Sequence, residues 1–300
     1  MKSPDGFLGL VMVGRLGNHI GSLAAGLAFA WEHNLELKCP QLGNRAVPRH
    51  VDLILEPMKA EFLPETFYWP NMCAQYQPVY ERLLAEYPGM ATTIPAEKIS
   101  AYHLHLQHAY RDIDIIPNSV LVGYFFNEQY FLPYKDRIKA LFQPPEGVSA
   151  YLNHKYGNII QDPKSVGIHY RDFANDGEKW VSKLSEDHFL DAVSQFDDTH
   201  TFYVCSNKIE NAKLFFKKVF DKTRKRVLYI DGERDFIDFY FLVSLKNVII
   251  SNSSFGWWVG YLNMHSDKLI VAPARDKWVL PVHLNAEIKL LPQTESWELV

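Results

Sequence analysis

Residues Asp238–Leu262, DFYFLVSLKNVIISNSSFGWWVGYL, decide the fold of this chain. The stretch predicts an amphipathic helix, a short apolar strand at Val248–Ile250, a turn of capping residues at 251–254, and a second helix. A helix that begins directly after a buried strand presents N–H groups without acceptors and the positive end of its dipole. Such a helix start can bind a phosphate, with hydroxyls from Ser253 and Ser254. Most strand–turn–helix connections hold no ligand, so both interpretations stand at this point.

Strands alternate with helices on either side of this stretch. An apolar run at Phe7–Val13 leads through a glycine turn into a helix of small residues, and a second alternating series starts at Ser165. This alternation predicts parallel sheets with helices on both faces. The segment Gln143–Lys164 contains three prolines and two glycines, which predicts a connection between domains. We therefore predict an α/β protein with two domains, residues 1–155 and 156–300.

The second half carries signals for single elements. Ser185 opens a capping box, SEDH, which predicts a helix that ends near Phe196. The other expected elements are strands at 165–168, 201–205, 227–230 and 269–272 and a helix at 209–220.

The glycine turn at residues 14–18 lacks the common nucleotide fingerprints. Its glycines follow the pattern GxxGxxxG, so the dinucleotide motif GxGxxG is absent. The P-loop is absent too, because no Lys-Ser or Lys-Thr pair follows the second glycine.

The composition bounds the class of protein. At 300 residues and 47% hydrophobic residues, the chain can bury a substantial core. A formal net charge of −4 gives no general attraction to nucleic acid, so we expect none as a partner. The three cysteines form no CxxC pair, which suits a reducing compartment. No apolar run approaches the length of a membrane span, and we expect a cytoplasmic location.

The basic stretch Lys213–Arg226 has two interpretations. Cationic side chains suit the C-terminal end of a helix, which predicts a solvated helix end. The same charges could give a weak peripheral contact with anionic membrane lipid.

A second group of residues has metal-binding potential. His103 and His105 alternate on one strand face, His108 follows, and Asp112 and Asp114 form a DxD pair. These side chains could hold a divalent cation, or they could form a polar strand face followed by a solvated turn.

Polar residues follow three of the predicted strands in the second half. They are His169, Arg171 and Asp172; Ser206 and Asn207; and Asn252, Ser253 and Ser254. Open parallel sheets bind ligands beyond the carboxyl ends of their strands. Arginine suits a diphosphate because its planar group makes paired, charge-assisted hydrogen bonds and stays protonated. A structural ion pair for Arg171 and a buried neutral imidazole for His169 are the alternatives.

Four blocks of sequence, in a conserved order, resemble the motifs of a known family. The blocks are Gly14-Arg15-Leu16-Gly17-Asn18, Gly123-Tyr124-Phe125 with Glu128 and Tyr130-Phe131, His169-Tyr170-Arg171, and Asp238 and Tyr240 with Ile249–Trp258. They are similar to G-x-L-G-N-Q, to G-Y-F-Q-S-E-K-Y-F, to the start of H-x-R-R-x-D, and to D-L-Y-L-M followed by I-I-A-N-S-T-F-S-W-W. On these blocks the chain resembles the α-1,2-fucosyltransferases of glycosyltransferase family 11, part of the GDP-fucose-dependent group.

The third block departs from the family motif. Asp172 stands where the family has its second arginine, Ala174 stands where it has aspartate, and Asp176 lies two residues later. A negative charge in place of a positive one beside a diphosphate should weaken donor binding. The departure implies another activated sugar, another donor pose or a poorly active enzyme.

The resemblance implies a GT-B fold, in which two Rossmann-like domains face each other across a cleft. Residues 1–155 would form the acceptor side and residues 156–300 would bind the GDP-sugar. The implied reaction is inverting transfer of L-fucose from GDP-fucose to a glycan hydroxyl in an α-1,2 linkage. It implies no cofactor and no required metal.

The resemblance also implies roles for single residues. Arg171 and His169 are the expected catalytic residues. The expected donor-binding residues are Asn252, Ser253, Ser254, Phe255, Ser206 and Asn207. Arg15, Gly17 and Asn18 are expected to face the cleft and touch donor or acceptor. Asp172 and Asp176 are candidate general bases.

Three alternatives remain open at the level of sequence. The chain could use another GDP-sugar. It could be a metal-dependent transferase that uses Asp112 and Asp114. It could also be an inactive relative that binds a nucleotide or a glycan.

Overall fold

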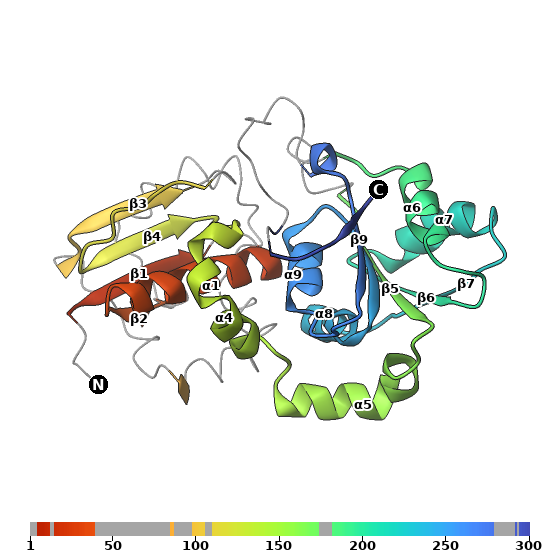
Figure 1. Ribbon diagram of the computed structural model, residues 1–300, viewed down its shortest axis with the longest axis horizontal. Coiled ribbons are helices and arrows are strands. Elements are labelled where there is room, and N and C mark those ends of the chain that lie inside the picture. Colours follow the sequence, from red (N-terminus) through yellow and green to blue (C-terminus); the bar gives the residue numbers. More distant parts are fainter. Residues whose placement is uncertain are drawn as a thin grey trace. The chain divides into compact units, whose positions relative to one another are not determined.

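The computed structural model describes residues 5–12, 15–39, 85–86, 98–105, 110–173, 182–278, 292 and 294–300. The chain divides into two compact units, Met1–Phe142 and Gln143–Val300. Each unit is built around its own sheet, and all strand pairs between described residues are parallel (Figure 1). The predicted class, α/β with parallel sheets, is confirmed.

The first unit contains a four-stranded sheet in the order β2-β1-β4-β3. Its strands are β1 (Phe7–Met12), β2 (Glu36–Lys38), β3 (Ala101–His105) and β4 (Ser119–Gly123). The buried helix α1 (Leu16–Glu32) follows β1 and lies close to the sheet, because a Cβ on Gly26 would come within 3.1 Å of Leu10 and 3.2 Å of Leu37. The unit continues through η4 (Glu128–Tyr130), η5 (Leu132–Tyr134) and α4 (Lys135–Leu141).

The second unit contains a six-stranded sheet in the order β10-β9-β8-β5-β6-β7. Its strands are β5 (Ser165–Tyr170), β6 (Thr201–Ser206), β7 (Arg226–Tyr229), β8 (Asn247–Ile250), β9 (Leu269–Ala272) and β10 (Glu298–Leu299). Counted within the unit this is the doubly wound order 3-2-1-4-5-6, read from β7 to β10. The chain direction across the sheet reverses between β5 and β8, and ligands of such sheets bind at that switch point.

Helices cover both faces of this sheet. On one face, α6 (Glu186–Ser194) and α7 (Ile209–Phe220) pack Phe189 and Phe216 into a core with Val166 and Phe202. On the other face, α8 (Asp235–Ser244) lies against β5, since a Cβ on Gly167 would come within 2.6 Å of the Leu242 side chain. The helix α9 (Ser254–Leu262) follows β8, and η6 (Arg275–Lys277) follows β9. The two layers leave the carboxyl ends of β5 and β8 at one sheet edge.

The division between the units lies after residue 142, ahead of the boundary expected at 155. Helix α5 (Glu146–Ile160) runs through that position and belongs to the second unit. The ring of Tyr156 lies 5.0 Å from that of Phe241 of α8, centroid to centroid, and its hydroxyl donates a hydrogen bond of 2.7 Å to Glu233. The prolines and glycines of this segment suggested a loop, but Pro145 is the N-cap residue and Gly157 lies within the helix. The donor and acceptor roles of the two domains stay predictions.

Several elements differ from their expected bounds. Strand β5 extends through Tyr170, so His169 lies inside the strand, and α8 begins three residues before Asp238. The short strands β2 and β10 were not expected, because a pair or triplet of residues carries too little pattern. How the two sheets face each other stays a prediction.

The basic stretch on and after α7 is matched by acidic side chains. Lys213 pairs with Glu210 and Asp231, Lys217 pairs with Asp221, and Lys218 and Lys222 pair with Glu186. These pairs favour the solvated helix end, and the membrane contact stays a prediction. Among the described helices, none has the length and apolar character that crossing a bilayer requires.

Candidate active site

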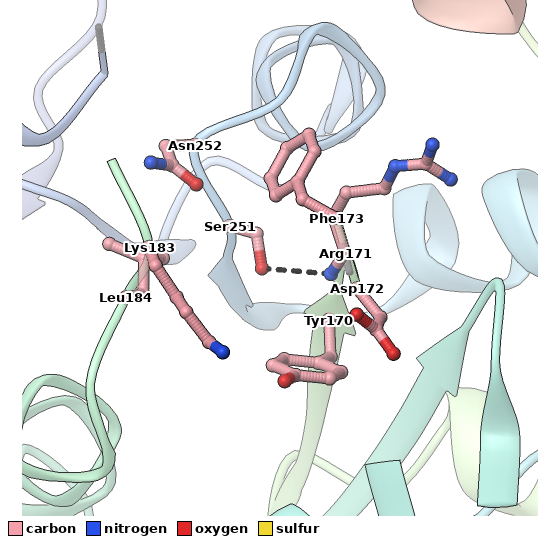
Figure 2. A pocket seen from close by; sticks show the side chains of 8 residues that line it. All are labelled: Tyr170, Arg171, Asp172, Phe173, Lys183, Leu184, Ser251 and Asn252. Atoms are coloured by element: carbon pink, nitrogen blue, oxygen red, sulfur yellow. Dashed lines mark hydrogen bonds between the residues drawn. The ribbon is translucent and has the colours of Figure 1, made fainter. Parts of the chain in front are cut away.

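The ends of β5 and β8 are joined by hydrogen bonds at the switch point. The Ser251 hydroxyl donates to the His169 carbonyl at 2.8 Å and accepts from the Arg171 amide at 3.1 Å (Figure 2). The Ser251 amide also donates to the His169 carbonyl at 3.1 Å. These bonds continue the pairing of the two strands, so two of the predicted polar clusters lie together.

The start of α9 has the geometry of an anion site. Ser253 is the N-cap residue, and its hydroxyl accepts from the Gly256 amide at 3.2 Å. Ser254 and Phe255 occupy the first turn, where amide groups have no acceptor within the helix. With the helix dipole behind them, these amides favour a negative charge at this place.

His169 is a buried, neutral imidazole. Its ring stacks on Phe255, with centroids 4.7 Å apart and an interplanar angle of 18°. Burial, and secondarily the charge of Arg171, lower the pKa of His169 to about 3. The Nδ1 atom is buried and has no hydrogen-bond partner among the described residues. At neutral pH this ring is therefore uncharged, and it packs against the first turn of α9. The catalytic role expected for His169 stays a prediction.

Arg171 is the permanent cation at the end of β5. Its guanidinium lies over the ring of Phe173 at 5.4 Å from the centroid. Figure 2 shows the side chain extending away from the segment that carries Lys183. A guanidinium held at a strand end can bind a diphosphate with two hydrogen bonds at once.

A pocket lies in the crevice between the ends of β5 and β8. Its lining residues are Tyr170, Arg171, Asp172, Phe173, Lys183, Leu184, Ser251 and Asn252 (Figure 2). Three of them, Arg171, Asp172 and Asn252, were predicted from the sequence. The other five lining residues were not predicted as site residues, and no motif in the sequence marks Lys183.

Asp172 is fixed by two asparagines. Its carboxylate accepts from the Asn211 amide at 2.6 Å. Asn207 accepts from the Asp172 backbone amide at 2.9 Å and donates to its carbonyl at 3.0 Å. Asn207 therefore holds the loop after β5, while the Ser206 hydroxyl accepts from the Lys208 amide at 3.1 Å. Their contact with a donor, and the role of Asp172 as a base, stay predictions. Asp176 lies outside the described residues.

Asn252 contributes a buried acceptor to the pocket. Its amide nitrogen donates to the carbonyl of Ser182 at 2.6 Å and to that of Lys277. Because both partners are carbonyl oxygens, the atom that faces them must be the amide nitrogen, and the other atom of the group is the oxygen Oδ1. Oδ1 is buried and has no partner among the described residues. A donor group on a ligand would satisfy it.

A buried acid lies beneath the same sheet edge. Burial, Asp235 and Glu233 raise the pKa of Asp238 to about 7, while a hydrogen bond with Cys205 acts in the opposite direction. One carboxylate oxygen of Asp238 has no partner among the described residues. Asp238 belongs to the fourth motif, but the sequence did not predict its raised pKa.

The predicted residues of the first unit lie at the start of α1. Arg15 is the N-cap residue, with an extended backbone, and its carbonyl accepts from the His19 amide at 3.0 Å. Gly17 is buried and Asn18 is half-buried in the first turn. Gly14 lies outside the described residues. Whether Arg15, Gly17 and Asn18 touch a donor or an acceptor stays a prediction.

The described part of the chain contains no cluster of side chains that would support the metal-binding alternative. His103 Nε2 lies 3.3 Å from the Ser119 hydroxyl, and Asp112 accepts from the Tyr110 hydroxyl at 2.6 Å. No three His, Cys, Asp or Glu side chains among the described residues converge as metal ligands do. The side chain of His105, and all of His108, lie outside that part.

Comparisons with known proteins find relatives that are named as glycosyl-group transferases. The alpha-1,2-colitosyltransferase of Escherichia coli is 24% identical over 296 residues, which cover 95% of this chain and 96% of that protein. The O-antigen biosynthesis glycosyltransferase WbnK of Escherichia coli is 26% identical over 167 residues, 53% of this chain and about half, 54%, of the relative. The solved structure of POFUT1 in complex with GDP is 11% identical, covers 91% of this chain and 99% of its own, and superposes with a TM-score of 0.49.

The sequence profile of the family described as Glycosyl transferase family 11 matches residues 94–278. The match covers more than half of the 300 residues and includes three of the four motif blocks, at 123–131, 169–171 and 238–258. The resemblance seen in the sequence is thereby confirmed, and this chain belongs to glycosyltransferase family 11.

Proposed function

We propose that this chain transfers L-fucose from GDP-fucose to a hydroxyl of a glycan, with inversion at the anomeric carbon and an α-1,2 linkage. The observation that carries the proposal is that Arg171 and the start of α9 follow neighbouring strands, β5 and β8, at the switch point of the second unit. A permanent cation and free helix amides at one sheet edge suit a nucleoside diphosphate.

The same groups suit the chemistry of the transfer. The acceptor oxygen forms a bond to C1 of the sugar as the bond from C1 to the β-phosphate oxygen breaks. Negative charge then grows on the departing GDP, and the acceptor hydroxyl loses its proton to a base or to water. Arg171 and the amides of Ser254 and Phe255 stabilise that charge without reorganising. The proposed reaction needs no divalent cation, and activity that persists in EDTA tests this point.

A related donor is the second candidate. The relative that aligns over 95% of this chain is named a colitosyltransferase. Asp172 lines the pocket and differs from the family motif, which has its second arginine at that position. We propose GDP-fucose as the first candidate donor and GDP-colitose as the second, with a glycan as the acceptor.

We also propose a cytoplasmic location. The buried thiols of Cys39 and Cys205 form no disulfide, which suits that compartment.

A donor screen tests the proposal. The purified chain is incubated with GDP-fucose, GDP-colitose and GDP-mannose, and the release of GDP is followed with and without glycan acceptors. The proposal predicts release from GDP-fucose that rises with an acceptor bearing a free galactose 2-hydroxyl. Release from GDP-colitose alone would establish the second candidate. Tight binding of GDP without turnover of any donor would identify an inactive relative.

A further inference from the structure

Lys183 places an ammonium group in the crevice pocket. The residue lies just before α6 and lines the pocket together with Tyr170, Ser251 and Asn252. Figure 2 shows its side chain extending from that segment toward the ring of Tyr170. The cation therefore enters the switch-point crevice from the side of the sheet that carries α6.

This lysine has no acidic partner among the described residues. Other lysines of the second unit, such as Lys213, Lys217 and Lys218, form ion pairs of 2.6 to 3.0 Å. No ion pair or hydrogen bond joins Lys183 to any described side chain, although Asp172 lines the same pocket. An unpaired ammonium in a crevice attracts an anionic ligand more strongly than a paired one on a surface.

The acidic side chain of the pocket, Asp172, is held by a hydrogen bond from another residue. The Asp172 carboxylate accepts from Asn211 on α7, and Figure 2 shows it on the far side of Tyr170 from Lys183. Arg171 and Lys183 are the cationic side chains that line the pocket.

A second observation points to a ligand at this place. Oδ1 of Asn252 is a buried acceptor without a partner among the described residues, and the residue as a whole is only 3% exposed. A buried acceptor of this kind requires a hydrogen-bond donor, which ordered water or a ligand hydroxyl can supply. The pocket thus offers two cationic side chains, Arg171 and Lys183, and one buried acceptor, which suits a phosphate ester of a sugar.

We propose that Lys183 is the second cationic contact of the donor diphosphate, in place of the arginine that the family motif has at the position of Asp172. The inference rests on the proposed function, because it takes GDP as the group that binds. Lysine contacts a phosphate as a point charge, so it can act from a different segment without the geometry of an arginine pair.

Calorimetric titration of the full chain with GDP tests this role. We expect Lys183→Met to weaken GDP binding about 10- to 100-fold, the loss typical of a hydrogen bond to a charged group. Lys183→Arg keeps the charge and should bind within about threefold of the wild type. Lys217→Met is the matched control. This lysine lies on α7, pairs with Asp221 and does not line the pocket, so the variant should bind GDP like the wild type.

Salt distinguishes a charge contact from a packing effect. The difference between the wild type and Lys183→Met should shrink between about 50 mM and about 500 mM salt, because screening weakens exposed charge contacts. Equal GDP binding by both proteins, or a loss that does not respond to salt, would overturn the role of Lys183 alone. A wild-type chain that does not bind GDP would overturn the proposed function together with it. Thermal unfolding of each variant confirms that the fold is kept.

Discussion

The imidazole of His169 stacks on the phenyl ring of Phe255, with centroids 4.7 Å apart and planes inclined by 18°. This contact joins the end of β5 to the first turn of α9. Phe239 of α8 packs edge-on against the same phenyl ring at 5.1 Å. The position of the helix start, and hence of its free amides, is therefore set by two aromatic contacts and by the Ser253 cap.

Gly256 is the residue that lets the two segments approach. A Cβ at this position would lie 2.8 Å from the Ser251 carbonyl oxygen and 2.9 Å from His169 Nδ1. Gly256→Ala should displace the start of α9, lower stability by about 1–3 kcal/mol and weaken GDP binding. Chemical denaturation and calorimetric titration measure the two effects.

Gly157→Ala is the matched control for this prediction. A Cβ on Gly157, within α5, meets no atom within 4 Å. The substitution should therefore stabilise the protein by about 0.5–1 kcal/mol through helix propensity and leave GDP binding unchanged. Equal behaviour of the two variants would refute the account of close packing at Gly256.

Asp238 makes the stability of the protein depend on pH. Its pKa in the folded state is about 7, above the ordinary value of 3.8, so the folded state holds a proton that the unfolded state has lost. The contribution of the protonated Asp238 to the free energy of unfolding is fully present below pH 4 and is lost as the pH rises toward 7. Asp238→Asn removes it, so the stability of this variant relative to the wild type should rise between pH 4 and pH 8, by at most about 1.4 kcal/mol per pH unit.

Thermal unfolding across this range compares the two proteins. Burial lowers the pKa of His169 to about 3 and that of His188 to about 4, so both histidines destabilise the fold as the pH falls below 6.5. They do so in the wild type and the variant alike, and the difference between the two isolates Asp238. A difference that stays constant or falls with rising pH would show that Asp238 is ionised throughout.

Asp172 should oppose the binding of an anion. Asp172→Asn keeps an acceptor for Asn211 and removes one negative charge from the pocket. We expect GDP to bind about 2- to 10-fold more tightly to this variant. Asp187→Asn, on the exposed first turn of α6, is the control and should leave binding unchanged. Weaker binding by Asp172→Asn would show that the carboxylate itself contacts the ligand.

Much of the second unit follows from its sequence. The alternation of strands and helices predicted the parallel sheet, and SEDH predicted the cap of α6, where the Ser185 hydroxyl accepts from the His188 amide. The predicted Asn252, Ser253 and Ser254 lie beside the predicted His169 and Arg171 because parallel strands end at one edge. For these residues, the local sequence pattern and the strand topology together were sufficient to predict that they lie at one edge of the sheet.

Other features depend on contacts that a sequence does not display. Lys183 reaches the pocket from a segment without a motif, and Asn211 engages Asp172 from a helix face that reads as ordinary surface. The neutrality of His169 and the raised pKa of Asp238 arise from burial by distant segments. Helix α5 continues through residue 155 because Gly157, which favours a break in the sequence, lies in open space within that helix.

Turnover of the donor by Arg171→Ala tests whether the end of β5 holds the diphosphate. At saturating acceptor, we expect this variant to release GDP from GDP-fucose about 100- to 1,000-fold more slowly than the wild type, with an unchanged unfolding temperature. Arg226→Ala, at an exposed position of β7, is the control and should retain full activity. Near wild-type turnover by a folded Arg171→Ala protein would contradict the assignment of the diphosphate site to the end of β5.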